Sequence, residues 1–401
     1  MTSAPPLDGI TVVDLTRVLS GPYCTMLLAD MGARVIKIER PGRGDETRAW
    51  GPPFQGGESA YFLSINRNKE SVALDFKQPA GRRLLDALVA SADVLVENFR
   101  PGTLDRLGLG YGRVSSARPD LVYCSVSGFG QTGPKRAVAG YDMVLQAEAG
   151  LMSITGPADR PPARLGVAVA DILAGLLACH GIVLALYAKQ RTGRGQLVDV
   201  AMFDSVVSLL TYQAALCLAT GVAPTRMGNE HPTIVPYDSF EAADGPFVLA
   251  VGNDEQWRRV CAAAGLAHLA DDPRFATNPA RVEHRAQLLP LLTATFRSRP
   301  KADWIAVLGR AGVPCGAVRD ISEVLADPQV AARGMLEAID HPAAGPLQLL
   351  GVPIKLSETP GRVRTPPPLL GQHTRQVLGD DLHLMAAEID ALERDGVIAC
   401  R

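Results

Sequence analysis

The stretch ITVVDLTRVLSGPYCTMLLADMGARVIKIER (residues 10–40) determines the fold class that the sequence predicts. Residues 10–15 are a short, β-branched apolar run, which favours a strand. The tripeptide SGP at 20–22 offers a capping residue and then a proline, and the apolar residues 24–31 continue the helix that it begins. Gly32 ends this helix, and residues 35–38 form a second strand. Such a unit predicts two parallel strands joined by a right-handed crossover.

The same alternation of strands and helices continues along the chain. Further strands are expected at 71–76, 94–96, 121–126 and 197–201, and helices at 79–90, 169–189 and 203–220. This order predicts an α/β fold with a doubly wound, Rossmann-like parallel sheet.

The character of the sequence changes after Gly221, where prolines interrupt the chain. Residues 239–252 have the pattern of a hairpin, and mostly helical segments follow. We therefore expect a large α/β domain over 1–224 and a second, smaller α+β domain over 225–325. Residues 326–401 contain a Pro- and Gly-rich connection at 338–370, after which the chain returns to the large domain and ends in a helix.

Composition argues against several classes of protein. The 401 residues carry 40 Lys and Arg against 42 Asp and Glu, so no overall positive field attracts nucleic acid. The seven cysteines are far apart and form no CxxC, so neither a disulfide framework nor a metal site is expected. Residues 1–9 lack the features of a signal peptide, and we expect a cytoplasmic protein.

Residues 166–188 form an apolar run that is long enough to raise the question of a membrane span. Asp171 and His180 interrupt it, and a charged residue at a bilayer centre costs roughly 3 kcal/mol on insertion scales. We therefore predict a buried core helix. His180 lies nine residues after Asp171, on the opposite side of that helix, and is expected to pack in the core rather than form an acid–base pair.

Standard motifs leave few candidate chemistries. The sequence contains no GxxxxGK[ST], GxSxG or HExxH, and its first strand–helix turn offers only Gly21, so a nicotinamide-dependent enzyme is not expected. Arg40 follows a strand, where a cation suits a ribose phosphate or an adenine face. Asp171, near the start of the most apolar helix, is either a functional carboxylate or a helix-capping one. The Gly-rich segment 127–133 would let backbone approach a ligand closely.

Several segments, in order along the chain, resemble the class III CoA-transferase (CaiB/BaiF) family, which includes formyl-CoA transferase and relatives of carnitine CoA-transferase. They include residues 7–48, 66–77, ADVLVENFRPGTLDRLGLGY (92–111), SVSGFGQTGP (125–134), AGYD (139–142), 167–205, 272–285 and GVPCGAV (312–318). This resemblance spans nearly the whole chain. It implies an enzyme that uses CoA thioesters and free carboxylic acids as substrates, with no tightly bound cofactor and no metal.

The resemblance also implies roles for single residues. Asp171 is the expected catalytic nucleophile. The expected CoA contacts are Val18, Leu19, Ser20, Arg40, Leu74, Asn98, Phe99, Arg106 and Tyr141. Two departures stand out: Ala139 occupies a position where some members have a lysine against the adenine, and residues 227–240 replace a run of glycines that formyl-CoA transferase uses as a lid.

The implied chemistry is CoA transfer through an acyl–aspartyl anhydride and an aspartyl-CoA thioester on Asp171. The acid pair stays open. Arg17, Arg48 or Arg164 could hold the distal carboxylate of a dicarboxylate, which makes succinyl-CoA a reasonable donor. An α-methylacyl-CoA racemase and a non-catalytic acyl-CoA-binding protein are the alternatives; the racemases have a histidine where this chain has Tyr141. The family further implies an interlocked homodimer.

Overall fold

The structure, a computed structural model, describes residues 4–401 and divides the chain into two compact units. The first comprises the described part of Met1–Leu151 together with Leu165–Tyr212 and Pro328–Arg401; the second comprises Met152–Arg164 and Gln213–Asp327. The second unit therefore begins before residue 225 and takes in an earlier segment. One reason is that Arg226 donates hydrogen bonds to the carbonyls of Pro157 and Arg160.

Within residues 4–401, the first unit is built on a seven-stranded sheet in the order β14-β5-β2-β1-β6-β7-β8. The strands are β1 (Thr11–Asp14), β2 (Arg34–Glu39), β5 (Lys69–Leu74), β6 (Val94–Glu97), β7 (Val122–Ser127), β8 (Leu197–Ala201) and β14 (Ile398–Ala399). Six of them pair in parallel, in the order of a Rossmann fold, and β14 adds to β5 in antiparallel fashion. The doubly wound parallel sheet is confirmed, with this one antiparallel edge strand that the sequence did not predict.

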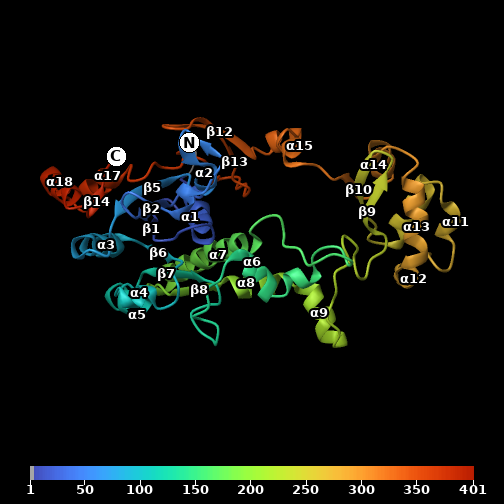
Figure 1. Cartoon of the computed structure of the whole chain (residues 1–401), viewed down its shortest axis with the longest axis horizontal. Coiled ribbons are helices and arrows are strands. Elements are labelled where there is room, and N and C mark those ends of the chain that lie inside the picture. The colour runs from blue at the N-terminus through green and yellow to red at the C-terminus, as the bar shows by residue number, and fades with distance from the viewer. Residues whose placement is uncertain (1–3) are drawn as a thin grey trace. The chain divides into compact units, whose positions relative to one another are not determined.

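Helices cover both faces of the sheet, as the ribbon shows (Figure 1). Neighbouring residues of a strand point to opposite faces, so Val13 packs with one layer of helices and Val12 with the other. The first layer contains α3 (Pro79–Ser91), α4 (Thr103–Arg106), α5 (Tyr111–Ala117), α17 (Thr374–Asp380) and α18 (Ala386–Arg394). The second contains α1 (Ser20–Asp30), α6 (Asp142–Glu148), α7 (Val169–Thr192) and α8 (Met202–Leu209).

Helix α7 packs closely on α1 and on the sheet. Fully buried small residues, among them Ala170, Ala174 and Ala178, recur every four positions and form its inner face. Among residues 4–401, α7 is the one single helix long and apolar enough to cross a membrane, and the bent pair α8 and α9 (Thr211–Thr220) passes the same test only if it is counted as one span. His180 was wrongly predicted to lie in the core: it is exposed and lines an apolar cavity of about 420 Å³ with Tyr23 and Val183.

Three features of the first unit differ from the sequence prediction. The segment 338–370 is not only a connection, because β12 (Leu336–His341) and β13 (Gly345–Leu350) form a hairpin there. The chain does not end in a helix, since β14 follows α18. The single helix expected at 203–220 is two helices, α8 and α9 (Thr211–Thr220), and Thr211, the first residue of α9, has a φ of 34°.

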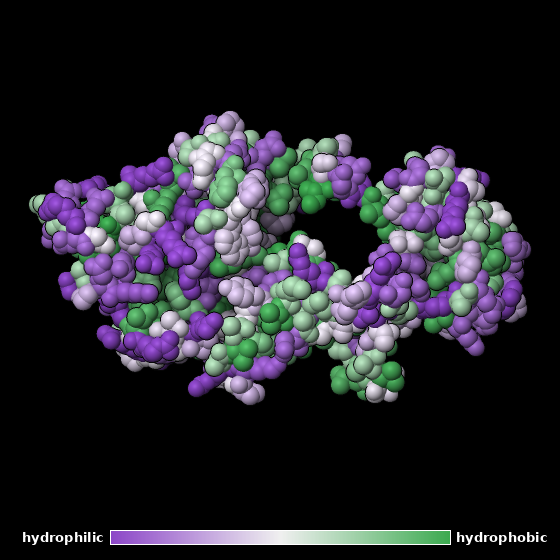
Figure 2. Space-filling model, viewed as in Figure 1, coloured by the Kyte–Doolittle hydropathy of each residue, from purple (hydrophilic) through white to green (hydrophobic). Residues whose placement is uncertain are grey.

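Shorter elements complete the first unit. They are a 3-10 turn (Glu46–Ala49), β3 (Phe54–Gln55), β4 (Glu58–Ser59), α2 (Ala60–Ile65) and α16 (Pro328–Ala332). Helix α9, which begins in the first unit and continues into the second, has no buried residue. Figure 2 shows mostly apolar surface over it, and Leu218 is 87% exposed.

The second unit has its own core. Its strands are β9 (Tyr237–Ala242), β10 (Gly245–Ala250) and β11 (Cys315–Ala317). Its helices are α10 (Asp254–Ala263), α11 (Ala267–Ala270), α12 (Asn278–Glu283), α13 (Arg285–Phe296), α14 (Lys301–Arg310) and α15 (Ile321–Leu325). A 3-10 turn, Leu151–Ile154, lies where the chain first enters the unit. The expected hairpin is β9–β10, with β11 on its other side. Phe240, Phe247, Phe296 and Trp304 pack in edge-on and tilted contacts between sheet and helices.

Candidate active site

The strand order places the candidate site at the topological switch point. Strands β1 and β6 are neighbours, but the chain continues from them toward opposite faces of the sheet, which opens a crevice at their carboxyl ends. The residues that follow β1 and β6 line a cavity of about 170 Å³ there. Its lining includes the predicted site residues Val18, Ser20, Asn98, Phe99, Tyr141 and Asp171, from four separate stretches of the chain.

Asp171 lies in the first turn of α7, at the cavity wall. Burial and the nearby carboxylate of Asp142 raise its pKa to about 6, against hydrogen bonds from the backbone and the hydroxyl of Ser20, which lower it. The carboxyl group is therefore mostly ionised at neutral pH, yet it is more basic than an ordinary aspartate. A nucleophilic carboxylate needs both properties.

Gly175, one turn after Asp171, permits the contact between α7 and Ser20. A Cβ atom at Gly175 would lie 2.6 Å from the carbonyl oxygen of Ser20, so only glycine lets the start of α1 approach α7 this closely. Because Ser20 is held here, its N–H and hydroxyl reach Asp171. The expected N-cap role of Ser20 is wrong: Leu19 occupies the N-cap position, with no side-chain cap.

Asp142 begins α6 and was not singled out from the sequence. One of its oxygens accepts from the backbone N–H of Ala170 at 2.8 Å, and the other accepts from Gln146 at 2.7 Å. It therefore caps α7 from outside, beside Asp171. The signal in the sequence was its position directly after Tyr141, in the segment AGYD.

The loop between β1 and α1 is held by hydrogen bonds to Asp45 and Lys37. Val18 has a φ of 69°, which is strained for a β-branched residue, and its N–H donates to Asp45 at 3.3 Å. The buried Lys37 donates to the carbonyl of Thr16 at 2.8 Å and pairs with Asp45 at 2.9 Å. Leu19 is buried against Met26 and Ile65. It lines neither the cavity of Asp171 nor a second cavity that adjoins it.

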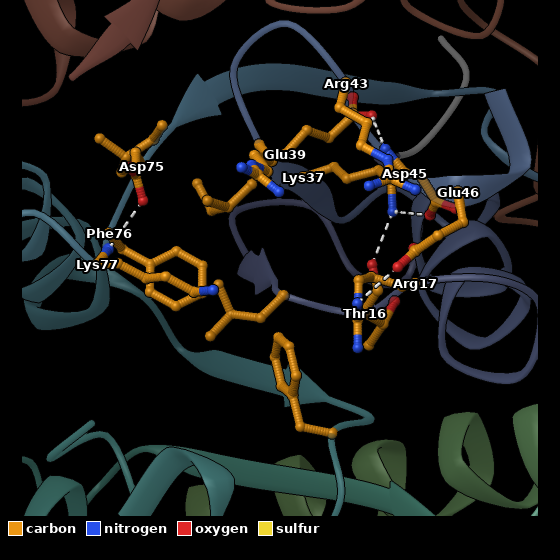
Figure 3. Close-up of a pocket in the computed structure, with 16 residues that line it drawn as sticks. Thr16, Arg17, Lys37, Glu39, Arg43, Asp45, Glu46, Asp75, Phe76 and Lys77 are labelled. Atoms are coloured by element: carbon orange, nitrogen blue, oxygen red, sulfur yellow. Dashed lines mark hydrogen bonds and ion pairs between the residues drawn. The ribbon is translucent and has the colours of Figure 1, made fainter. Parts of the chain in front are cut away.

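A second cavity, of about 240 Å³, adjoins the first (Figure 3). Arg17 and Phe99 line both cavities, and the Arg17 guanidinium lies 4.8 Å from the centre of the Phe99 ring. The predicted residues Arg40 and Leu74 line this second cavity. So do Arg43 and Lys77, which sequence reasoning missed although both are cations that follow strand ends.

The remaining predicted residues are placed as follows. Arg106, in α4, lines neither cavity, and its guanidinium donates to Thr103 within the same turn. Tyr141 is 70% exposed and precedes α6. Of the three arginines considered for a distal carboxylate, Arg48 is bound to Glu39 and stacked on Phe62, while Arg164 belongs to the other compact unit.

The Gly-rich segment lines the same cavity as Asn98 and Asp171. Ser127 and Gly128 belong to the cavity lining, and a Cβ atom at Gly128 would lie 3.0 Å from the Cα of Gly140. The backbone of this segment is thus close to the cavity. Among residues 4–401 no group of three or more His, Cys, Asp or Glu side chains is placed to hold a metal ion.

Comparison with known proteins assigns the chain to a family. The family model described as CoA-transferase family III matches residues 7–374. Succinyl-CoA:glutarate CoA-transferase of Mus musculus is 43% identical over 396 residues, covering 99% of this chain and 91% of the relative. Succinate–glutarate CoA-transferase of Agrobacterium fabrum is also 43% identical over 396 residues, covering 97% of each chain.

A solved structure agrees with these sequences. The crystal structure of a CaiB/BaiF family protein from Brucella suis superposes with a TM-score of 0.84 at 43% identity, covering 94% of this chain and 100% of that one. The resemblance that the sequence carried is confirmed: the chain belongs to CoA-transferase family III and is an enzyme of that class.

Proposed function

We propose that the protein transfers CoA from a dicarboxylic acyl-CoA, with succinyl-CoA as the first candidate, to a free dicarboxylic acid such as glutarate. The observation that carries this proposal is the position of Asp171, whose carboxylate of raised pKa lines the same cavity as Val18, Ser20 and Asn98. The names of the mouse and Agrobacterium relatives support the acid pair.

In the proposed reaction, a carboxylate oxygen of Asp171 attacks the thioester carbonyl carbon. The C–S bond breaks, CoA leaves as a thiolate, and an acyl–aspartyl anhydride remains. The thiolate then attacks the aspartyl carbon and releases the donor acid, which leaves an aspartyl-CoA thioester. The acceptor carboxylate repeats the two steps in reverse order and regenerates Asp171. No net proton transfer is needed in this sequence.

The surroundings of Asp171 suit these steps. The Ser20 donors and the positive end of α7 favour the ionised carboxylate, so it is ready to attack at neutral pH. Backbone N–H groups of the Gly-rich segment are close enough to the cavity to serve as donors to the tetrahedral oxyanions. The apolar side chains of Val18, Val126 and Met202 would limit attack by water on the anhydride.

CoA would lie across both cavities. Arg40, Arg43 and Lys77 supply cations for its phosphates in the larger cavity, and Phe99 continues the path into the cavity of Asp171. Arg17 is the one of the three considered arginines that lines the cavity of Asp171, which favours it for a distal carboxylate. The racemase alternative is disfavoured, because this chain has Tyr141 where the racemases have the histidine that serves as their second base.

We also propose that the enzyme is an interlocked homodimer. The apolar helix α9 buries no residue, and Leu176 and Val183 on α7, which line the apolar cavity of about 420 Å³, are 44% and 40% exposed. Such surfaces suit contact with a second copy. A folded monomer at micromolar concentration in sedimentation would contradict this arrangement.

The proposed function is tested with a panel of acyl-CoA donors and carboxylic acid acceptors, read by mass spectrometry of the acyl-CoA products. Succinyl-CoA with glutarate should give glutaryl-CoA and free succinate. The matched control is Asp171→Asn, which keeps the shape of the side chain but lacks the nucleophile. It should bind CoA normally and transfer none. Wild-type turnover in that variant, with deamidation excluded, would disprove the covalent step.

A further inference from the structure

Glu97 is a buried carboxylate that the proposed reaction does not use. It is the last residue of β6, directly before Asn98 and Phe99, and its exposed fraction is 5%. Burial raises its pKa to about 7, as do the carboxylates of Asp105 and Asp199, against hydrogen bonds from Ser125 and Phe99. A hydrophobic residue at this sheet position would avoid the cost of burying a carboxylate.

Its two oxygens face two different segments. Oε2 accepts from the backbone N–H of Phe99 at 2.8 Å, on the segment that follows β6. Oε1 accepts from the hydroxyl of Ser125, the residue paired with Glu97 on β7. Both carboxylate oxygens of Glu97 therefore accept a hydrogen bond, one from the segment after β6 and one from β7.

The hydrogen bonds continue from Ser125 into the Gly-rich segment. The Ser125 hydroxyl accepts from the side-chain amide of Gln131 at 2.6 Å, and the backbone N–H of Gln131 donates to Asp199 on β8 at 3.1 Å. Gln131 thus fixes the far end of the segment that contributes Ser127 and Gly128 to the cavity. The chain of bonds runs Gln131, Ser125, Glu97, Phe99.

The two ends of this chain of hydrogen bonds lie in two separate segments that form part of the wall of the Asp171 cavity. Asn98, Phe99, Arg100 and Pro101 line one wall, and Ser127 and Gly128 line the other. We propose that Glu97 is a positioning residue that sets the spacing of these two walls, and so the placement of the acyl group between Asp171 and the Gly-rich backbone. This inference rests on the proposed function, since the acyl group is the one that the transferase would place there.

The decisive variant is Glu97→Gln. Its carbonyl oxygen still accepts from Phe99, but its amide donates to Ser125, so the Ser125 hydroxyl proton loses its acceptor. The Gly-rich wall should shift while the Asn98 wall stays. A small misplacement of the reacting groups lowers the reaction rate by up to roughly 100-fold. We therefore expect kcat to fall about 10-fold, with KM for acyl-CoA within about threefold of the wild-type value.

Ser125→Ala removes the same link and should give a similar loss, and the double variant should lose no more than either single one. The matched control is Glu70→Gln, in β5, where the carboxylate pairs with Arg34 away from both cavities; its kinetics should be those of wild type. A kcat of Glu97→Gln within twofold of wild type, or losses that multiply in the double variant, would overturn the proposal.

Hydrogen exchange separates this proposal from the transferase assignment. In Glu97→Gln, amides of 127–133 should exchange faster, while those of the distant β2 should be unchanged. If the wild-type chain moves CoA to no acid, the proposed function fails, but the exchange result still decides the role of Glu97. Unchanged exchange at 127–133 would show that Glu97 does not hold that wall.

Discussion

The side chain of Asn98 hydrogen-bonds both backbone groups of Arg17 across the switch point of the sheet. Its Oδ1 accepts from the Arg17 N–H at 2.9 Å, and its Nδ2 donates to the Arg17 carbonyl at 2.7 Å. The amide thus extends the pairing of β1 and β6 beyond the ends of both strands. Asn98 therefore shapes the loop that carries Val18 and Ser20, in addition to any contact that it makes with CoA.

Asn98→Ala should loosen that loop. Two hydrogen bonds are lost, and a partly exposed pair of this kind is worth about 1–2 kcal/mol. We expect KM to rise about 10-fold for every acyl-CoA tested, since the loop lines both cavities that CoA would cross. Steady-state kinetics with two donors of different acyl length check this. A rise for one donor only would place Asn98 in acyl selection.

The pH dependence of kcat/KM should follow Asp171. Its raised pKa of about 6 means that the free enzyme loses its nucleophile as pH falls through 6, so activity should drop about 10-fold between pH 7 and pH 5. Asp142→Asn removes a neighbouring negative charge and should move this limb to lower pH. A limb that does not move in that variant would mean that another group controls it.

The free energy of unfolding should also depend on the ionisation of Asp171, but in the opposite direction from activity. Ionisation supplies the nucleophile and lowers stability. Because the folded-state pKa is raised, the contribution of Asp171 to stability is present below the unfolded pKa of about 3.8 and is lost as pH rises through about 6. Asp171→Asn should therefore melt at a higher temperature than wild type at pH 8, and the difference should shrink toward pH 4. Melting curves across this range test the sign.

Arg40→Ala should weaken CoA binding by roughly 1–3 kcal/mol, the range for a charge-assisted contact. The loss should appear in KM more than in kcat, because the larger cavity is remote from the reacting carbonyl. Acyl-dephospho-CoA, which lacks the 3′-phosphate, is the matched probe: if Arg40 meets that phosphate, wild type and variant should bind it alike. Equal KM values for intact acyl-CoA would locate the nucleotide elsewhere.

Tyr141 distinguishes transfer from racemisation. Because this chain has a tyrosine where the racemases have a histidine as second base, a 2-methylacyl-CoA in deuterated water should keep its Cα proton while CoA passes to a free acid. Mass spectrometry of the recovered thioester reads both outcomes. Deuterium entering Cα at a catalytic rate, without transfer to any acid, would favour the racemase.

The sequence predicted the core of the fold because its strands are strongly patterned. The run 10–40 and the strand at 197–201 match β1, α1, β2 and β8 closely. The hairpin β12–β13 was missed because Pro and Gly dominate its surroundings, and β14 was missed because two residues have no periodicity and take their strand form only from β5. The break between α8 and α9 falls at Leu210, in a segment that contains neither glycine nor proline and so gives no local signal.

The candidate site was predicted in part. Six predicted residues line the cavity of Asp171, and Arg40 and Leu74 line the adjoining one, whereas Leu19 and Arg106 line neither. Asp142 and Glu97 were missed because each bonds a segment far away in the sequence, Asp142 the backbone N–H of Ala170 and Glu97 the hydroxyl of Ser125, and such pairings follow from the tertiary fold. A charged residue at the carboxyl end of a strand beside the switch point was the available signal for Glu97.

The pairing of β14 with β5 has a consequence for synthesis on the ribosome. β5 emerges early, but the strand that covers its edge follows only after the entire second unit has been translated. During that interval the nascent chain presents the unpaired edge of β5, which invites intermolecular pairing. Yield of native enzyme should therefore depend on chaperone supply during translation, and a substitution that places a charge at Ile398 should increase inclusion-body formation.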